Sequence, residues 1–303
     1  MTVIEQDIFS TPAVMRQTIR RVAEQGSAVQ PWLSGPVVFL GCGSSYCVAR
    51  AAATLYEAAT GNPAQAILAS EYRPRAGWSH VAISRTGTTS ELVEAMQRIR
   101  SAGLRIMLLG GEPGSPALAQ ADITLPLEFA AEEGIVQTRF ISAAILALRL
   151  LIEGPAPGAL DLLPDGVAQA LASFDSAPLL TFGHVAFLGR GWRHGLAMSA
   201  ALSLQETALT SPEAHHTLDY RHGPIACADE RTLIWCFDPP DDGPSAAVLD
   251  ESRSAGATVR CTGGDPQVEL ALVQLYAARR AMAQGIDPDA PRNLRRAIVL
   301  PAS

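Results

Sequence analysis

Short apolar runs alternate with longer stretches of helical composition along the first half of the chain. The run 37–40 leads through a glycine-rich turn into the alanine-rich segment 48–59, which predicts a strand, a tight turn and a helix. Further strands are expected at 65–69, 80–84 and 104–109, and further helices at 90–102 and 138–152. Strands that alternate with helices at this spacing predict a doubly wound parallel sheet.

The same pattern starts again in the second half. The apolar run 185–188 leads into Gly189-Arg190-Gly191 and a helical stretch, 194–209, at an offset of 189 − 41 = 148 residues from the first turn. Two more strands are expected at 232–237 and 258–261, and a helix at 268–285. The predicted fold class is therefore α/β, with two doubly wound parallel-sheet domains in tandem, a helical N-terminal segment and an irregular C-terminal tail.

Turn-forming residues set the expected domain limits. Proline and glycine cluster at 154–158, which predicts a first domain at 1–155 and a second at 156–286. The tail, 287–303, is rich in proline and arginine up to residue 296, so a regular element is expected at most at 297–300. Such a tail is either frayed or recruited into a site, and we expect it to contribute to the site.

Composition narrows the class of protein. The 303 residues are 48% hydrophobic and 17% charged, as in globular proteins, and no apolar run approaches the roughly 18 residues of a membrane span. Glu5 and Asp7 lie where a secretory signal would be basic and then apolar, so a cytoplasmic location is predicted. A net charge of −7 without a basic run argues against a nucleic-acid surface, although it leaves room for a small basic pocket.

Cysteine and lysine usage excludes several chemistries. Five cysteines without CxxC spacing argue against a disulfide framework and a zinc site, and predict buried thiols. All 23 basic residues are arginine, so the chain has no lysine. Schiff-base chemistry, which needs an amine that can lose its proton, and P-loop nucleotide binding are both excluded.

Two hydroxyl-rich turns follow predicted strands and precede predicted helices. Parallel strands bring such turns together at one edge of the sheet, where helix N-termini offer free N–H groups. Hydroxyl groups there could bind a monophosphate; a dinucleotide is less suited, because no Gly-x-x-Gly follows Gly43. The alternative is that these side chains only cap the two helices. The hydroxyl groups in question belong to Ser45, Ser84, Thr86 and Thr89.

Several strings, in this order along the chain, resemble the sugar isomerase (SIS) domain family. They are 42–46 (CGSSY), 69–73 (ASEYR), 84–91 (SRTGTTSE), 132–139 (EEGIVQTR), 187–191 (FLGRG), 221–224 (RHGP) and 291–294 (PRNL). The whole chain resembles the tandem-SIS isomerase half of glucosamine-6-phosphate synthase and its stand-alone relatives, the amino-sugar-phosphate isomerases and deaminases. The resemblance implies two SIS domains in tandem that act on a phosphosugar.

The resemblance also implies roles for individual residues. Glu206 matches the carboxylate that moves a proton between C1 and C2, and His222 matches a histidine that assists ring opening from the neighbouring subunit, which implies a homodimer. Phosphate binding is implied for Cys42, Gly43, Ser44, Ser45, Ser84, Arg85 (through its backbone), Thr86 and Thr89, and sugar contacts for Ile135, Gln137 and Arg296. No cofactor and no metal are implied.

The chemistry of aldose–ketose interconversion requires the same residue types. Aldose–ketose interconversion passes through an enediol, so one carboxylate of raised pKa can remove and return the proton, and a histidine of near-neutral pKa can protonate the ring oxygen. Taken alone, Glu206 is better explained as a solvated helix residue, and His222 could equally be a turn residue. The adjacent His215 and His216 point apart as sequence neighbours, so they are taken as structural and not as metal ligands.

Two departures from the family pattern limit the function. Ser203 and Arg296 replace lysines of the synthase, so an imine cannot form at Arg296, and we expect no glutaminase segment before the first domain. The favoured function is an isomerase or deaminase of an amino-hexose 6-phosphate, of the type that converts glucosamine 6-phosphate to fructose 6-phosphate. Two alternatives stay open: a non-catalytic phosphosugar-binding regulator, and a deglycase of sugar–amine 6-phosphates, which needs a wider pocket.

Overall fold

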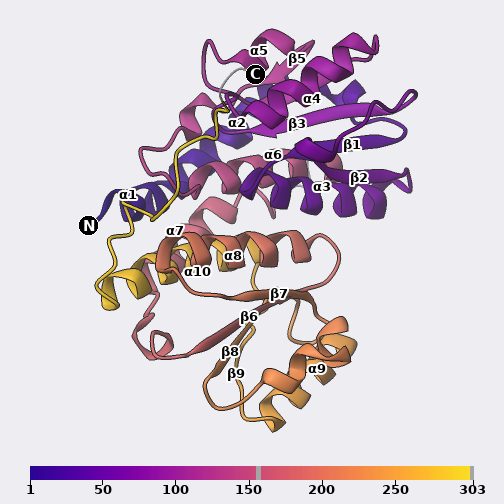
Figure 1. Ribbon diagram of the computed structural model, residues 1–303. Helices are drawn as coiled ribbons and strands as arrows, with labels where there is room; N and C mark the ends of the chain where they lie inside the picture. The colour runs from indigo at the N-terminus through magenta and orange to yellow at the C-terminus, as the bar shows by residue number, and fades with distance from the viewer. Residues whose placement is uncertain (155–157, 301–303) are drawn as a thin grey trace.

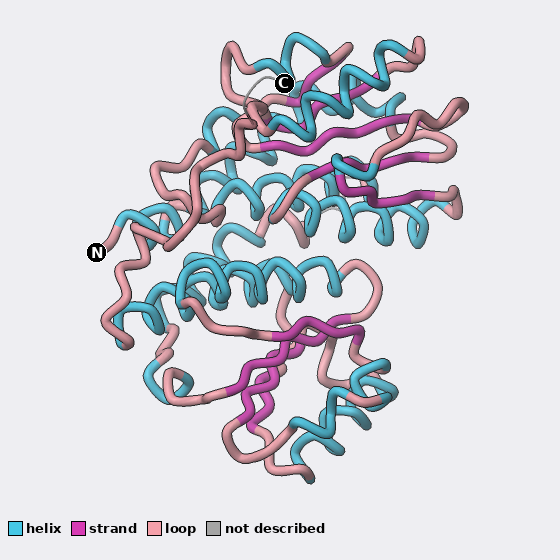
Figure 2. The backbone as a smooth tube through the Cα atoms, viewed as in Figure 1, coloured by secondary structure: helices cyan, strands magenta, loops and turns pink. Residues whose placement is uncertain are grey.

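The computed structural model describes residues 1–154 and 158–300 and contains two parallel β-sheets with helices on both faces (Figures 1 and 2). The first sheet has the strand order β2-β1-β3-β4-β5. Its strands are β1 (Val37–Gly41), β2 (Ala64–Leu68), β3 (Ser79–Ser84), β4 (Ile106–Gly110) and β5 (Ile123–Leu125). This confirms the α/β class and the parallel pairing that the sequence predicts.

Alternating side chains of the first sheet pack against two different helix layers. Val37 and Phe39 face one layer and Val38 and Leu40 face the other, as the period of two in a strand requires. The first layer is formed by α2 (Thr11–Val29), α3 (Ser44–Thr60) and α6 (Arg139–Glu153), and the second by α4 (Ser90–Ser101) and α5 (Pro116–Gln120). The short helix α1 (Val3–Phe9) precedes them.

The second sheet repeats this plan with fewer strands. Its order is β7-β6-β8-β9, which matches the order β2-β1-β3-β4 of the first sheet in sequence sense. The strands are β6 (His184–Gly189), β7 (Glu213–His216), β8 (Thr232–Cys236) and β9 (Thr258–Arg260); the helices are α7 (Leu163–Ser173), α8 (Arg193–Ala208), α9 (Gly243–Ser254) and α10 (Pro266–Ala283). Helices α8 and α10 cover the face toward the first half, and α9 covers the other (Figure 1).

Helices α3 and α8 join the two halves. Gly195 of α8 lies against Ala51 of α3, and a Cβ at Gly195 would come within 2.6 Å of the Ala51 nitrogen, so only glycine permits this approach. One apolar core runs from the first sheet through these helices to the second sheet. The expected domain limit at 155/156 lies outside the described residues, and the division into 1–155, 156–286 and 287–303 stays a prediction.

Some expectations are corrected by the structure. Strands β5 and β7 are not predicted by the sequence, since β5 has only three residues and β7 is mostly polar. Between Gln284 and Leu300 there is neither helix nor strand, so the element considered at 297–300 does not form. Only Cys47 and Cys236 are buried thiols; Cys42 and Cys261 are partly exposed and Cys227 is exposed. Among the described helices none is long and apolar enough to cross a membrane.

Candidate functional site

The turn after β1, called here the first turn (residues 41–45), is shaped by two glycines. A Cβ at Gly41 would lie 2.6 Å from the Ser45 carbonyl, so only glycine lets α3 begin directly against the strand end. Gly43 has φ +52°, a backbone conformation that favours glycine. The first turn therefore presents Ser44 and Ser45 at the carboxyl edge of the sheet.

The turn after β3, the second turn (residues 84–89), lies beside the first because β1 and β3 are neighbours. Its own hydroxyl groups hold its shape: the Ser84 Oγ accepts from the Gly87 N–H at 2.9 Å, and the Thr86 Oγ1 accepts from the Thr88 N–H at 3.3 Å. Gly87 has φ +69°, and a Cβ there would clash with the Ser115 side chain at 2.3 Å. The second turn is thus a defined backbone cradle.

Neither helix that follows these turns has a side-chain cap. Gly43 and Thr89 are the N-cap residues of α3 and α4, and no side-chain cap hydrogen bond is made at either position. Within the described residues, no hydrogen bond uses the backbone N–H groups of Ser44, Thr86 or Thr89. The interpretation that the hydroxyls only cap helices is therefore wrong, and the N–H groups are available to an anion.

Two adjoining cavities lie over the turns. The inner cavity is lined by Cys42, Ser45, Ile83, Ser84, Arg85, Thr86, Thr89, Leu92, Gln137 and Arg296. The outer cavity, of about 160 Å³, is lined by Cys42, Gly43, Ser44, Arg85, Thr89, Ile135, Gln137, Glu206, Leu294, Arg295, Arg296, Ala297 and Ile298. Every predicted site residue except His222 therefore lies at one of the two cavities, although they come from five separate parts of the chain.

Glu206 reaches the outer cavity from the last turns of α8. Burial raises the pKa of Glu206 from its ordinary value of 4.5 to about 7, against a lowering by the nearby Arg85 guanidinium. A carboxylate with this pKa is half ionised near neutral pH, which suits a group that must both take and return a proton. Cys42 also lines the cavity, but burial and the charge of Glu91 raise the pKa of its thiol to about 11, so the thiol is a poor nucleophile at neutral pH.

The raised pKa of Glu206 predicts a pH-dependent loss of stability. The folded protein retains the proton between pH 4.5 and about 7, while the unfolded chain has lost it, so the free energy of unfolding falls as pH rises through this window. The loss is at most on the order of 3 kcal/mol. Between pH 5 and pH 8, urea unfolding should show that the wild type loses stability relative to Glu206→Gln, since the histidines that also titrate in this window are common to both proteins; an equal pH dependence of the two proteins would contradict it.

The C-terminal tail (residues 284–300) returns from α10 to the first sheet, passing α1 on the way (Figure 1). The Asp289 carboxylate accepts from the N–H groups of Val3 and Ile4 at 2.7 and 2.8 Å, which anchors the tail to the start of α1. Farther along, the Ile298 carbonyl accepts from the Ser90 N–H at 3.1 Å, at the first turn of α4. The tail thus forms one wall of the outer cavity.

Arg296 lies in this wall and pairs with Glu112. Arg296 is the sequence position at which the resemblance predicts a lysine. The remaining tail residues that line the outer cavity, Leu294, Arg295, Ala297 and Ile298, were missed by sequence reasoning, because nothing local shows which part of an irregular tail will meet a distant sheet edge.

His222 is not brought to these cavities by its own chain. It ends the 3₁₀ turn Asp219–His222 after β7 and is exposed. The neighbouring histidines form their own contacts: His215 lies 3.0 Å from a Glu213 carboxylate oxygen, and the ring of His216 stacks on that of His194 at 3.7 Å. In the described part of the chain, no three His, Cys, Asp or Glu side chains are grouped to hold a metal ion.

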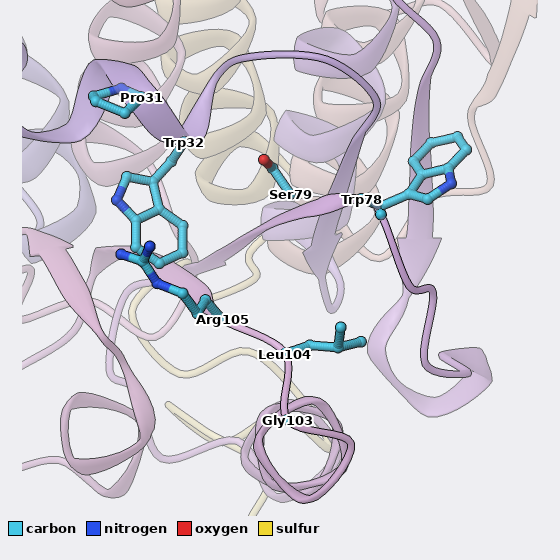
Figure 3. Close-up of a pocket in the computed structure, with 8 residues that line it drawn as sticks. Pro31, Trp32, Trp78, Ser79, Gly103, Leu104 and Arg105 are labelled. Carbon is cyan, nitrogen blue, oxygen red and sulfur yellow. The ribbon is translucent and has the colours of Figure 1, made fainter.

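A wider groove of about 410 Å³ lies at the opposite, amino-terminal edge of the first sheet (Figure 3). Trp32 and Trp78 stand on its two sides, and the Arg105 guanidinium lies 4.4 Å from the centre of the Trp32 ring. It contains no carboxylate and none of the predicted site residues. The smaller cavities at the carboxyl edge, in contrast, contain both turns and the Glu206 carboxylate.

Comparison with known proteins gives a match to a family profile over the first half of the chain and a similarity to individual proteins over nearly the whole chain. The sequence profile of the SIS domain matches residues 34–154. Two glutamine–fructose-6-phosphate aminotransferases (isomerizing), from Methanothermobacter thermautotrophicus and Symbiobacterium thermophilum, are 26% and 27% identical over 97% of this chain. The chain spans 57% and 58% of the length of these two relatives.

Solved structures share the fold over nearly the full length. A glucosamine-6-phosphate deaminase from Thermotoga maritima is 25% identical with a TM-score of 0.84, covering 99% of this chain and 100% of that chain. A tagatose-6-phosphate ketose/aldose isomerase from Escherichia coli is 16% identical with a TM-score of 0.82, covering 100% and 98%. At that identity the second likeness concerns the fold alone.

Proposed function

We propose that this chain, which carries a SIS domain and is related to the isomerizing aminotransferases and to phosphosugar isomerases, is an enzyme acting on an amino-hexose 6-phosphate. The phosphate would bind in the inner cavity to the N–H and hydroxyl groups of the two turns. The sugar would extend into the outer cavity past Gln137 and Ile135, where Glu206 would move the proton between C1 and C2. The observation that carries the proposal is a carboxylate of pKa about 7 facing the space next to an anion cradle.

The reaction we favour is deamination, in which glucosamine 6-phosphate and water give fructose 6-phosphate and ammonia, or else a simple aldose–ketose isomerisation, which keeps the nitrogen in the product. Arg296 cannot form an imine, because a guanidinium does not lose its proton, so both proton-transfer steps fall to Glu206. A deglycase would need room for a bulky amine, and the outer cavity of about 160 Å³ supports a smaller substrate. We keep a cytoplasmic location and the lack of a cofactor as predictions.

We further propose that the second half is a second copy of the SIS unit. The equal strand order supports this, and so do the glycines at its first turn: a Cβ at Gly189 would lie 2.6 Å from the Arg193 carbonyl, as one at Gly41 would from Ser45. Gly191 has φ +55°, close to the +52° of Gly43. In this arrangement only the first unit would bind substrate, and His222 of a second subunit would complete the site.

A substrate panel tests the reaction. Wild-type protein incubated with hexose and hexosamine 6-phosphates should release ketose phosphate, together with ammonia if it is a deaminase and without ammonia if it is an isomerase. Heat stabilisation by the same compounds without any product would replace the proposed enzyme with a phosphosugar-binding regulator, since ligands of the folded state raise its melting temperature whether or not they react.

A further inference from the structure

The Arg85 side chain leaves the second turn and enters the loop that precedes α6. Its Nη1 donates to the Glu132 Oε2 at 2.9 Å and to the Gly134 carbonyl at 3.2 Å. Its Nη2 donates to the carbonyls of Ile135 at 3.0 Å and Arg296 at 2.9 Å. One guanidinium therefore joins three segments that meet at the outer cavity: the second turn, the loop before α6 and the tail.

Glu132 extends this link through its other oxygen. The Oε1 accepts from the backbone N–H and the Oγ1 of Thr138, the latter at 2.9 Å, and from the Phe140 N–H at 3.3 Å. These bonds tie the loop to the N-terminal end of α6. Ile135 and Gln137, which line the outer cavity, lie between the two ends that Glu132 ties together.

The Arg85–Glu132 ion pair is almost completely buried. The side chains of Arg85 and Glu132 are 2% and 0% exposed, whereas the Arg21–Glu128 pair on the surface is 17% and 45% exposed. A buried ion pair is costly to desolvate and is retained only where its remaining hydrogen bonds are satisfied. Here the Arg85 Nη1 and Nη2 donate to Glu132 and to the backbone that carries the cavity wall, while the Arg85 Nε has no partner among the described residues.

We propose that Arg85 and Glu132 are a positioning pair for the reaction: they hold the loop before α6 and the tail at the distance from the second turn that places the substrate against Glu206. This rests on the proposed function. Neither side chain needs to touch the substrate, and the phosphate contacts of the second turn come from its backbone and hydroxyl groups.

Arg85 has a second effect, on the proton-transfer group itself. Its positive charge opposes the rise in the pKa of Glu206 that burial causes. Removing that charge should raise the pKa of Glu206 further and move the acid limb of the activity profile to higher pH. The other ionisable groups around Glu206 are Cys42 from the first turn, Cys47 from α3, Glu91 beside Cys42 on α4, and Arg295 and Arg296 from the tail.

Three variants of the full chain test the proposal. In Arg85→Gln, kcat should fall about 100-fold, because a displacement of about 1 Å costs that much, while KM changes little. The acid limb should also move to higher pH. Arg85→Lys keeps the charge but cannot reach four acceptors, so kcat should fall while the acid limb stays in place. Arg21→Gln, which removes the surface Arg–Glu pair, is the matched control and should behave as wild type.

Hydrogen exchange measured by mass spectrometry gives a readout independent of turnover. In Arg85→Gln and Arg85→Lys, peptides covering 131–138 and 294–300 should exchange faster than in wild type and in Arg21→Gln. Arg85→Gln leaves Glu132 as a buried unpaired charge and so risks not folding. In that case the same measurements on Arg85→Lys and on the neutral double variant Arg85→Gln/Glu132→Gln test the positioning role.

The outcomes distinguish a failure of the positioning role from a failure of the proposed function. Normal kcat and normal exchange in the folded variants would overturn the positioning role while leaving the proposed function intact. Loss of turnover through KM alone, with an unmoved acid limb in Arg85→Gln, would also overturn it. If the wild type turns over no phosphosugar, the proposed function fails, and the exchange data still test whether Arg85 holds the loop and the tail.

Discussion

Replacing Glu206 with glutamine is expected to lower kcat for the preferred amino-hexose 6-phosphate at least about 1,000-fold. Glutamine has nearly the same shape but cannot take a proton from carbon. Glu206 lies at the outer cavity, apart from the polar inner cavity, so heat stabilisation by the substrate should stay close to that of wild type.

The pH profile provides an internal check on this assignment. Proton removal requires the ionised carboxylate, so kcat/KM of the wild type should rise with pH through the pKa of Glu206, near 7. Glu94→Gln is the matched control, since Glu94 is an exposed glutamate of α4 that pairs with Arg98 on the same helix. If Glu206→Gln retained most of the activity, or lost substrate binding together with activity, Glu206 would not be the proton-transfer group.

The location of the two turns could be predicted from the sequence because local rules determine it. Apolar runs before Gly41 and Ser84 indicate strands, the residues after them indicate turns and helices, and parallel pairing places such turns at one edge. The structure brings the two turns together as expected. The direction of the Arg85 side chain could not be predicted, since its four acceptors lie 47 to 211 residues away in sequence.

The candidate role of Glu206, in contrast, could not be predicted from local sequence. On a helix with no strong apolar face, a single glutamate has the composition of a solvated surface position. Its raised pKa arises from burial, and the walls of the outer cavity come from α3, the loop before α6 and the tail, which are distant in sequence. The resemblance to a family selected this residue; local pattern could not. Strand β7 was missed for a related reason, because its polar sequence Glu213–His216 gives no apolar signal.

The position of His222 makes the subunit composition of the site testable. His216, shortly before it, stacks on His194 near the start of α8, while Glu206 lies near the end of the same helix, roughly 18 Å away at 1.5 Å per residue. His222 itself lines neither cavity of its own chain. If His222 takes part in ring opening, it must therefore serve the site of a neighbouring copy, which requires at least a two-fold dimer.

Mixing two inactive variants should then restore activity. Glu206→Gln and His222→Asn homodimers, each nearly inactive, are unfolded together and refolded so that subunits pair at random. Half of the dimers are mixed, and in each mixed dimer one site carries both substitutions and the other carries none, so about a quarter of wild-type activity should return.

The control pairs Glu206→Gln with Thr86→Val, because both residues line cavities of the same chain. In those mixed dimers each site keeps one substitution, so no activity should return. Full activity of His222→Asn, or equal recovery in both mixtures, would contradict a shared site. Recovery confined to the first mixture would instead assign the two catalytic groups to different subunits, because no arrangement within one chain produces an intact site from these two variants.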